Sequence, residues 1–340
     1  MTSLRSRLFV VVVALVTAGS ACQSQSAPTQ ISTLDDWSAA PPTCPPFPPP
    51  SSTVVSLTPA DADRLPSIIG QAQPNTTFLL ADGLYQMSIP TDGPRTILIN
   101  AAGITVRSAS GNAEAVIIDG EYVTREIFAL RADDVTLAEI TLTRALHHLV
   151  HVSPGGSKHV EHTLLYGLRL IDGGEQFVKV NSNGAQLWSD AGRVQCSRFL
   201  LTDAGRPHIA NHTGGCYTGG IDTHGGRDWV VRNNHFEGIY CTNGGLAEHA
   251  IHFWRRSRDT LIENNTIVDC ARGIGLGLIA DGPEHQRTYD DEPYPEITEY
   301  IDHLGGLVRN NVIWNAIDWY DTGIGIVNTR GRTYSWYCSR

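Results

Sequence analysis

Short runs of alternating apolar and polar residues recur along this chain at a spacing of about 30 residues. The run IDTHGGRDWVVRNNHF (221–236) is followed by the similar run IHFWRRSRDTLIENNTI (251–267). Each begins with an alternating strand pattern, turns at an Arg-Asp pair and continues into a strand that ends in two asparagines. A third asparagine pair follows at 310–311, after an insertion. Repetition of this kind predicts a solenoid, in which each repeat is one coil.

The repeats consist of β-type residues with glycine and asparagine at the turns, and no helical period connects them. This pattern predicts an all-β, single-domain, right-handed parallel β-helix, with equivalent strands about 4.8 Å apart. We expect Asn233, Asn264 and Asn310 to stack as a structural ladder, because asparagine tolerates the left-handed backbone of a turn. A short helix within 65–73 would cap the N-terminal end of the solenoid.

The first 53 residues differ in composition from the repeats. Residues 1–21 have a basic start, an apolar core and small residues before Cys22, as in a secretory signal of the bacterial lipoprotein type with Cys22 as the lipid acceptor. The alternative is ordinary cleavage nearby. Residues 22–53 are polar and proline-rich and predict a disordered tether. The β-helix domain is expected over 54–329, and 330–340 is expected to be irregular, from a truncated or frameshifted reading frame or as a surface for a partner.

Net charge and cysteine content limit which partners and cellular compartments are expected. The net charge of −10 argues against a nucleic-acid partner, which would require a basic face. A secretory signal followed by cysteines predicts export. With a lipid on Cys22 the protein would be an outer-membrane or cell-surface lipoprotein, and without it the protein would be periplasmic or secreted. A monomer that contacts the membrane only through its lipid anchor is expected. Six cysteines remain after Cys22, and their pairing stays open: Cys44, Cys196, Cys216, Cys241, Cys270 and Cys338.

The strand before each asparagine strand has a middle residue between two apolar residues. Because the apolar pair faces the core, the middle residue faces outward. Stacking these residues from coil to coil gives one predicted column, which consists of Ala129, His151, Lys179, Asp222, His252, Gly277 and Gly325. We expect its ionisable members to line a solvent-open groove, walled by the insertions at 203–215 and 279–305.

The four ionisable column residues are the candidate catalytic residues: His151, Lys179, Asp222 and His252. A carboxylate between a lysine and a histidine would orient the imidazole and raise its basicity. The neighbouring side chains that could contact a sugar or its carboxylate are Asn181, His224, Glu248, His249, Trp254 and Arg255. The simpler alternative is an ordinary ion pair beside surface histidines.

Metal-binding motifs are not evident. The chain has no HExxH or CxxC spacing, so no transition-metal site is predicted. The one candidate cofactor is Ca²⁺, held by carboxylates of the acidic loop, although a solvated loop is the simpler interpretation. The carboxylates available there are Asp281, Glu284, Asp290, Asp291 and Glu292.

The first coils, NTTFLLADGLY (75–85) and RTILINAAGITVRSASGNAEAVIIDG (95–120), resemble those of secreted right-handed β-helix proteins of the polysaccharide lyase-like superfamily. These include chondroitinase B-like, alginate lyase-like and pectate lyase-like enzymes. The resemblance implies a polysaccharide partner and cleavage of a uronic-acid-containing glycan by β-elimination. The family's catalytic motifs have no match here, so the base is taken from the column, as Lys179 or His252. A glycoside hydrolase and a non-catalytic, glycan-binding or adhesive surface solenoid are the alternatives, because the same opening occurs in enzymes and non-enzymes.

Overall fold

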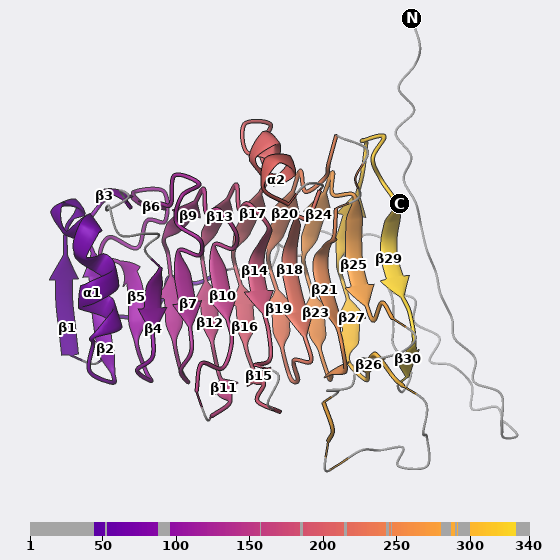
Figure 1. The fold of residues 1–340 in the computed structure, drawn as a ribbon, viewed down its shortest axis with the longest axis horizontal. Helices are drawn as coiled ribbons and strands as arrows, with labels where there is room; N and C mark the ends of the chain where they lie inside the picture. Colours follow the sequence, from indigo (N-terminus) through magenta and orange to yellow (C-terminus); the bar gives the residue numbers. More distant parts are fainter. Residues whose placement is uncertain are drawn as a thin grey trace, which may run out of the picture.

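The computed structural model describes residues 44–330, except 52, 88–95, 157, 184–185, 214–215, 243–244, 246, 280–286, 290 and 292–299. Its strands stack into three long sheets, and the two α-helices of the described residues lie outside them (Figure 1). The signal segment, Cys22 with its proposed lipid, Cys338 and the segment after 330 lie outside the described residues, so those predictions stay as stated.

The three long sheets contain nearly all the strands. A nine-stranded sheet contains β1 (Thr53–Leu57), β2 (Thr76–Leu80), β5 (Thr105–Ser108), β8 (Thr136–Ala138), β12 (Leu164–Tyr166), β16 (Arg193–Gln195), β19 (Val230–Arg232), β23 (Leu261–Glu263) and β27 (Leu307–Arg309). An eight-stranded sheet, here called the column sheet, contains β4 (Ile97–Ile99), β7 (Phe128–Leu130), β10 (Val150–Val152), β14 (Gln176–Val180), β18 (Gly219–His224), β21 (His249–Trp254), β25 (Arg272–Leu276) and β29 (Thr322–Ile326). The third sheet contains β3 (Gly83–Gln86), β6 (Val116–Asp119), β9 (Thr141–Thr143), β13 (Arg169–Ile171), β17 (Arg198–Leu200), β20 (His235–Glu237), β24 (Thr266–Val268) and β28 (Val312–Trp314).

From β2 onward, consecutive strands of the chain fall in different sheets, and neighbours within each long sheet pair in parallel. The chain therefore winds through the three sheets in rotation, which is the parallel β-helix predicted from the repeat. Two small sheets lie at the turns. One pairs β11 (Val160–Glu161) with β15 (Ser189–Asp190), and the other contains β22 (Ser257–Arg258), β26 (His303–Leu304) and β30 (Thr329–Arg330).

The core lies between the sheets and is built from the apolar residues on either side of the column. Val178, Ile221 and Ile251 occupy paired positions on neighbouring strands and are fully buried. Phe253 is fully buried beside them. The alternation of apolar and polar residues therefore predicts correctly which side chains face inward.

The two asparagines of each pair have different structural roles. The first member of each pair takes a left-handed backbone, with φ of 57° at Asn233 and 56° at Asn264. The second member forms the ladder: the Asn265 side-chain amide donates to the Asn311 side-chain oxygen at 2.9 Å, and Asn234 donates in the same way to Asn265 at 3.0 Å. The predicted structural ladder is confirmed, and its hydrogen bonds belong to the second asparagine.

The N-terminal end is covered by a 3-10 helix (Pro59–Arg64) that leads directly into α1 (Leu65–Gly70). Leu65 and Ile69 of α1 are buried against the first coils, so α1 acts as the predicted helical cap, although it ends before 73 (Figure 1). Among the described residues, no helix has the length and apolar character needed to cross a membrane.

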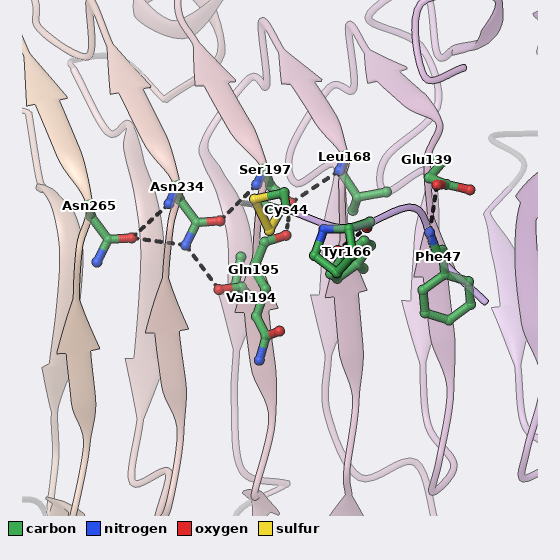
Figure 2. The surroundings of a disulfide bond; sticks show 12 residues. Cys44, Phe47, Glu139, Tyr166, Leu168, Val194, Gln195, Ser197, Asn234 and Asn265 are labelled. Atoms are coloured by element: carbon green, nitrogen blue, oxygen red, sulfur yellow. Dashed lines mark hydrogen bonds between the residues drawn. A yellow bond between two sulfur atoms is a disulfide. The ribbon is translucent and has the colours of Figure 1, made fainter. Parts of the chain in front are cut away.

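Residues 44–51 correct part of the predicted disordered tether. Cys44 forms a disulfide with Cys196, and the chain then crosses the outer side of the nine-stranded sheet (Figure 2). The Phe47 amide donates to Glu139 at 3.0 Å, and the Phe47 ring lies 5.4 Å from that of Tyr166. These contacts join residues far apart in sequence, and local composition cannot predict them.

The remaining described cysteines lie at successive turns. Cys216 and Cys241 form a second disulfide, a pairing that the sequence left open. Cys270 is a buried thiol, and burial raises its pKa to about 12.

The two insertions lie at opposite ends of the column strands. The first forms α2 (Arg206–Thr213), and Arg206 donates to the carbonyls of Gly238 and Tyr240, on the turn that leads into β21. The second is described only in part. Within it, Arg287 donates to the Gly225 carbonyl, and Tyr289 donates to that of Arg256 at 2.6 Å, on turns that leave the column sheet.

Candidate functional site: a buried column with an open edge

The structure brings the four ionisable column residues together. His151, Lys179, Asp222 and His252 occupy directly paired positions on β10, β14, β18 and β21. The next position is Gly275 rather than the predicted Gly277, because β25 pairs Ile274 with Ile251. Gly277 has already left the strand, with φ of +71°.

Three of the four side chains are closed off from solvent. Lys179 is 5% exposed, Asp222 is 2% exposed and His252 is fully buried, whereas the His151 side chain is 23% exposed. The Trp254 ring lies parallel over His252, with centroids 5.3 Å apart. The expectation of a solvent-open groove along the column is therefore wrong at these positions, because a neighbouring side chain covers the outward-facing residue.

Asp222 is the centre of the buried network. One of its oxygens contacts the Lys179 ammonium group and lies 3.4 Å from His224 Nε2, while the other accepts a 2.7 Å hydrogen bond from Trp254 Nε1. His252 Nδ1 lies 3.8 Å away. Burial alone would raise the pKa of this carboxyl, but His224 and the Lys179 charge hold it well below its usual range. Asp222 is therefore an anion fixed by its neighbours.

His224 and Trp254 lie at the end of this network, where the column sheet opens to solvent. They are paired across β18 and β21, both are partly exposed, and their rings meet edge to face at 4.7 Å. The Lys179 ammonium lies 3.1 Å from His224 Nε2. Burial lowers the pKa of His224, which favours a neutral imidazole near neutral pH. This edge offers an oriented proton acceptor beside an aromatic surface.

Arg255 adds a cationic group to the same edge. Its side chain is exposed, and its guanidinium lies 4.7 Å from the centre of the Trp254 ring. We call His224, Trp254 and Arg255 the open edge.

His151 lies one coil before Lys179 in the column and is partly exposed. Asn181 Nδ2 lies 3.2 Å from His151 Nε2, as expected for residues that flank the column. His151 Nδ1 also lies 3.7 Å from Glu126, a residue outside the predicted column. The nearby His151 imidazole is the main cause that lowers the pKa of Glu126. Glu126 precedes the strand that carries Ala129, so its position one coil away is the only sequence signal for it.

Glu248 and His249 do not form an exposed rim. His249 is 4% exposed, and its ring lies 4.4 Å from that of His252. The ring rests on Gly275, where an added Cβ would come within 2.7 Å of it. Glu248 Oε2 lies 3.5 Å from His252 Nδ1. These side chains therefore extend the buried network toward the start of β21.

The carboxylates proposed for Ca²⁺ lie mostly outside the described residues. Asp291 is described, and both of its oxygens pair with arginines, at 2.9 Å from Arg227 and 3.1 Å from Arg258. This carboxylate therefore serves ion pairs that hold the insertion to the coils.

Neither family models nor curated proteins match the chain. Solved structures do match. An alginate lyase from Paenibacillus sp. str. FPU-7 has 13% identity and a TM-score of 0.43, over 82% of this chain and 99% of that one. Pectate lyase Pel9A has 9% identity and a TM-score of 0.43, over 83% and 79%. PfbA, a surface adhesin of Streptococcus pneumoniae, has 11% identity and a TM-score of 0.41, over 84% and 81%. The likeness concerns the fold alone, and these proteins differ in what they do.

Proposed function

We propose that this protein cleaves a uronic-acid-containing polysaccharide by β-elimination at the open edge. The observation that carries the proposal is the His224 imidazole, which is partly exposed, lies against Asp222 and Lys179, and has a pKa that burial lowers toward the neutral form. Trp254 and Arg255 lie beside it. An exported protein is supported by the two disulfides, which persist in oxidising compartments.

The reaction needs three groups that the open edge can supply. His224 would accept the proton from C5 of the uronate at Nδ1, while its Nε2 would carry the ring proton toward the Asp222 carboxylate, 3.4 Å away. Loss of that proton forms the C4–C5 double bond and breaks the bond from C4 to the glycosidic oxygen, which leaves with a proton from solvent. Arg255 would neutralise the uronate carboxylate, and Trp254 would provide a flat surface for the sugar ring.

Burial changes the roles expected from the sequence. Lys179 and His252 are too buried to reach a C5 proton, so neither fits the part of base. Lys179 and Asp222 instead position His224. A glycoside hydrolase is less well supported, because it needs two carboxylates about 5–9.5 Å apart around the bond to be cleaved. In the described part of the column, Asp222 is the one carboxylate, and it is engaged by its ion pair.

The test is incubation with polyuronates, followed by the ultraviolet absorbance of the unsaturated product. His224→Asn should lower the rate by about 100-fold or more, since a general base typically contributes that much. The matched control is His235→Asn, because His235 is a partly exposed histidine on the third sheet that pairs with Glu237. New reducing ends without the absorbance would show hydrolysis, and binding without new ends would show a non-catalytic solenoid. Either result overturns the proposal.

A further inference from the structure

A cluster of three side chains lies at the start of β21, on the side of Asp222 away from the open edge. It consists of Glu248, His249 and His252, and their ligand-type atoms all lie within 4.8 Å of one another. Residues three apart in a strand normally face opposite sides of the sheet. Here Gly275 has no side chain, so the His249 ring folds onto the outer side and meets His252.

The atoms that converge in this cluster lack hydrogen bonds. Glu248 Oε2, His249 Nδ1 and His252 Nδ1 are each buried, and none bonds to a residue that the structure describes. Leaving a buried polar atom unsatisfied costs about 1–3 kcal/mol, so three in one place indicate a missing partner. A ligand that accepts all three lone pairs at once would remove this cost.

His252 is also held in the orientation typical of a metal ligand. Its Nε2 lies 3.4 Å from the Gly277 carbonyl, which can only accept a hydrogen bond. Nε2 therefore carries the proton, and Nδ1 presents a lone pair to the cluster. Histidines that bind metals usually donate their other ring nitrogen to a carbonyl or carboxylate in this way.

A second group of two histidines and one glutamate serves as a comparison, because its members pair with one another. His147 Nδ1 lies 2.9 Å from one oxygen of Glu175, and His148 Nε2 lies 3.3 Å from the other. His148 Nδ1 is 2.8 Å from the Gln176 carbonyl. Both histidines thus pair with the carboxylate, and no shared ligand is needed to explain the group.

We propose that Glu248, His249 and His252 bind a divalent transition metal ion, with Zn²⁺ the best fit. Two imidazoles and one carboxylate are a typical ligand set for zinc and its neighbours, whereas Ca²⁺ takes six to eight oxygens. Glu248 Oε2 and His252 Nδ1 are 3.5 Å apart. That separation is close to the edge of a zinc tetrahedron with ligands at about 2.0–2.1 Å.

The site departs from the sequence expectation of no transition-metal ion. The spacing Glu-His-x-x-His lies on a strand, and it becomes a cluster only because Gly275 on the next coil makes room for His249. A search for helical motifs such as HExxH does not detect such an arrangement. The proposal does not depend on the polysaccharide reaction.

The test is a titration of the chelator-treated, full-length protein with Co²⁺ alone, followed by its visible absorption, with Zn²⁺ added afterwards to displace it. One equivalent should bind with the intense spectrum of tetrahedral coordination. Glu248→Gln should weaken binding by about tenfold or more. Glu175→Gln, in the matched group, and His224→Asn, at the open edge, should leave it unchanged.

Two further measurements keep the test independent of folding defects. Gly275→Ala should displace the His249 ring without removing any ligand, and so weaken Co²⁺ binding while circular dichroism stays the same. Zn²⁺ should raise the melting temperature of the wild type and not that of Glu248→Gln. Failure of the folded wild-type protein to bind Co²⁺, or binding that Glu248→Gln retains, would overturn the metal site and leave the His224 proposal standing.

Discussion

Replacing Asp222 by asparagine tests how much the buried Lys179–Asp222 ion pair contributes to the stability of the fold. The two residues are 5% and 2% exposed. The substitution keeps the shape and the acceptor for Trp254 but leaves the Lys179 ammonium buried beside His224 alone. Removing one partner of a buried ion pair typically costs about 3–5 kcal/mol, because the other charge stays desolvated. We expect a loss of that size in the free energy of unfolding.

A double-mutant cycle separates the pair from the rest of the network. Lys179→Met removes the cation, and Asp222 then keeps the hydrogen bond from Trp254 and its contact with His224. The double substitution leaves no unpaired charge, so it should cost less than the two single changes added together. The difference is expected to be up to about 3 kcal/mol, as for other residues in direct contact.

The assay is urea unfolding of the four proteins, followed by circular dichroism and tryptophan fluorescence. Glu237→Gln serves as the control, because its pair with Arg198 is exposed (46% and 37%) and should contribute about 1 kcal/mol or less. If the free energy of unfolding of Asp222→Asn lies within about 1 kcal/mol of the wild-type value, the pair is solvated in solution and the burial argument fails.

Two more predictions concern stability. Asn265→Ala removes four hydrogen bonds, three of them buried, to Asn234, Asn311 and the Val231 carbonyl, and should cost about 3 kcal/mol or more in urea unfolding; a cost below about 1 kcal/mol would contradict the ladder. Burial lowers the pKa of His148 to about 3, so the unfolded chain, with a histidine pKa of about 6.5, takes up the proton first as pH falls. Stability should therefore drop by about 2 kcal/mol per such histidine between pH 8 and pH 5. His148→Gln should reduce that drop, and an unchanged pH profile in this variant would contradict the assignment.

The fold and the column register follow from local patterns in the sequence. The apolar residues on either side of each column position, such as Ile221 and Ile251, must face the core, so the residue between them faces outward. Register is well specified wherever one face of a sheet is buried, and Asp222 accordingly pairs with His252. The prediction fails at Gly277, because glycines at both 275 and 277 fit the apolar pattern.

Exposure could not be predicted in the same way. The pattern tells which side of the sheet a residue faces, but not which other side chains cover it. Trp254 covers His252 from two positions along the same strand, and His249 reaches it only because Gly275 is small. Likewise, the contact of residues 44–51 with the coils depends on Cys196, far away in sequence. These features depend on how coils stack, which composition does not contain.

The position of Asp222 determines which substitutions can distinguish the two proposals. Its carboxylate lies 3.4 Å from His224 at the open edge and 3.8 Å from His252 in the metal cluster. Asp222→Asn would thus disturb both imidazoles and destabilise the fold, so loss of activity in this variant would not identify a catalytic residue. His224 and Glu248 are both partly exposed, and they contact different residues: His224 contacts Asp222, whereas Glu248 contacts His252. Their single substitutions change one proposed site each, which makes them the informative pair.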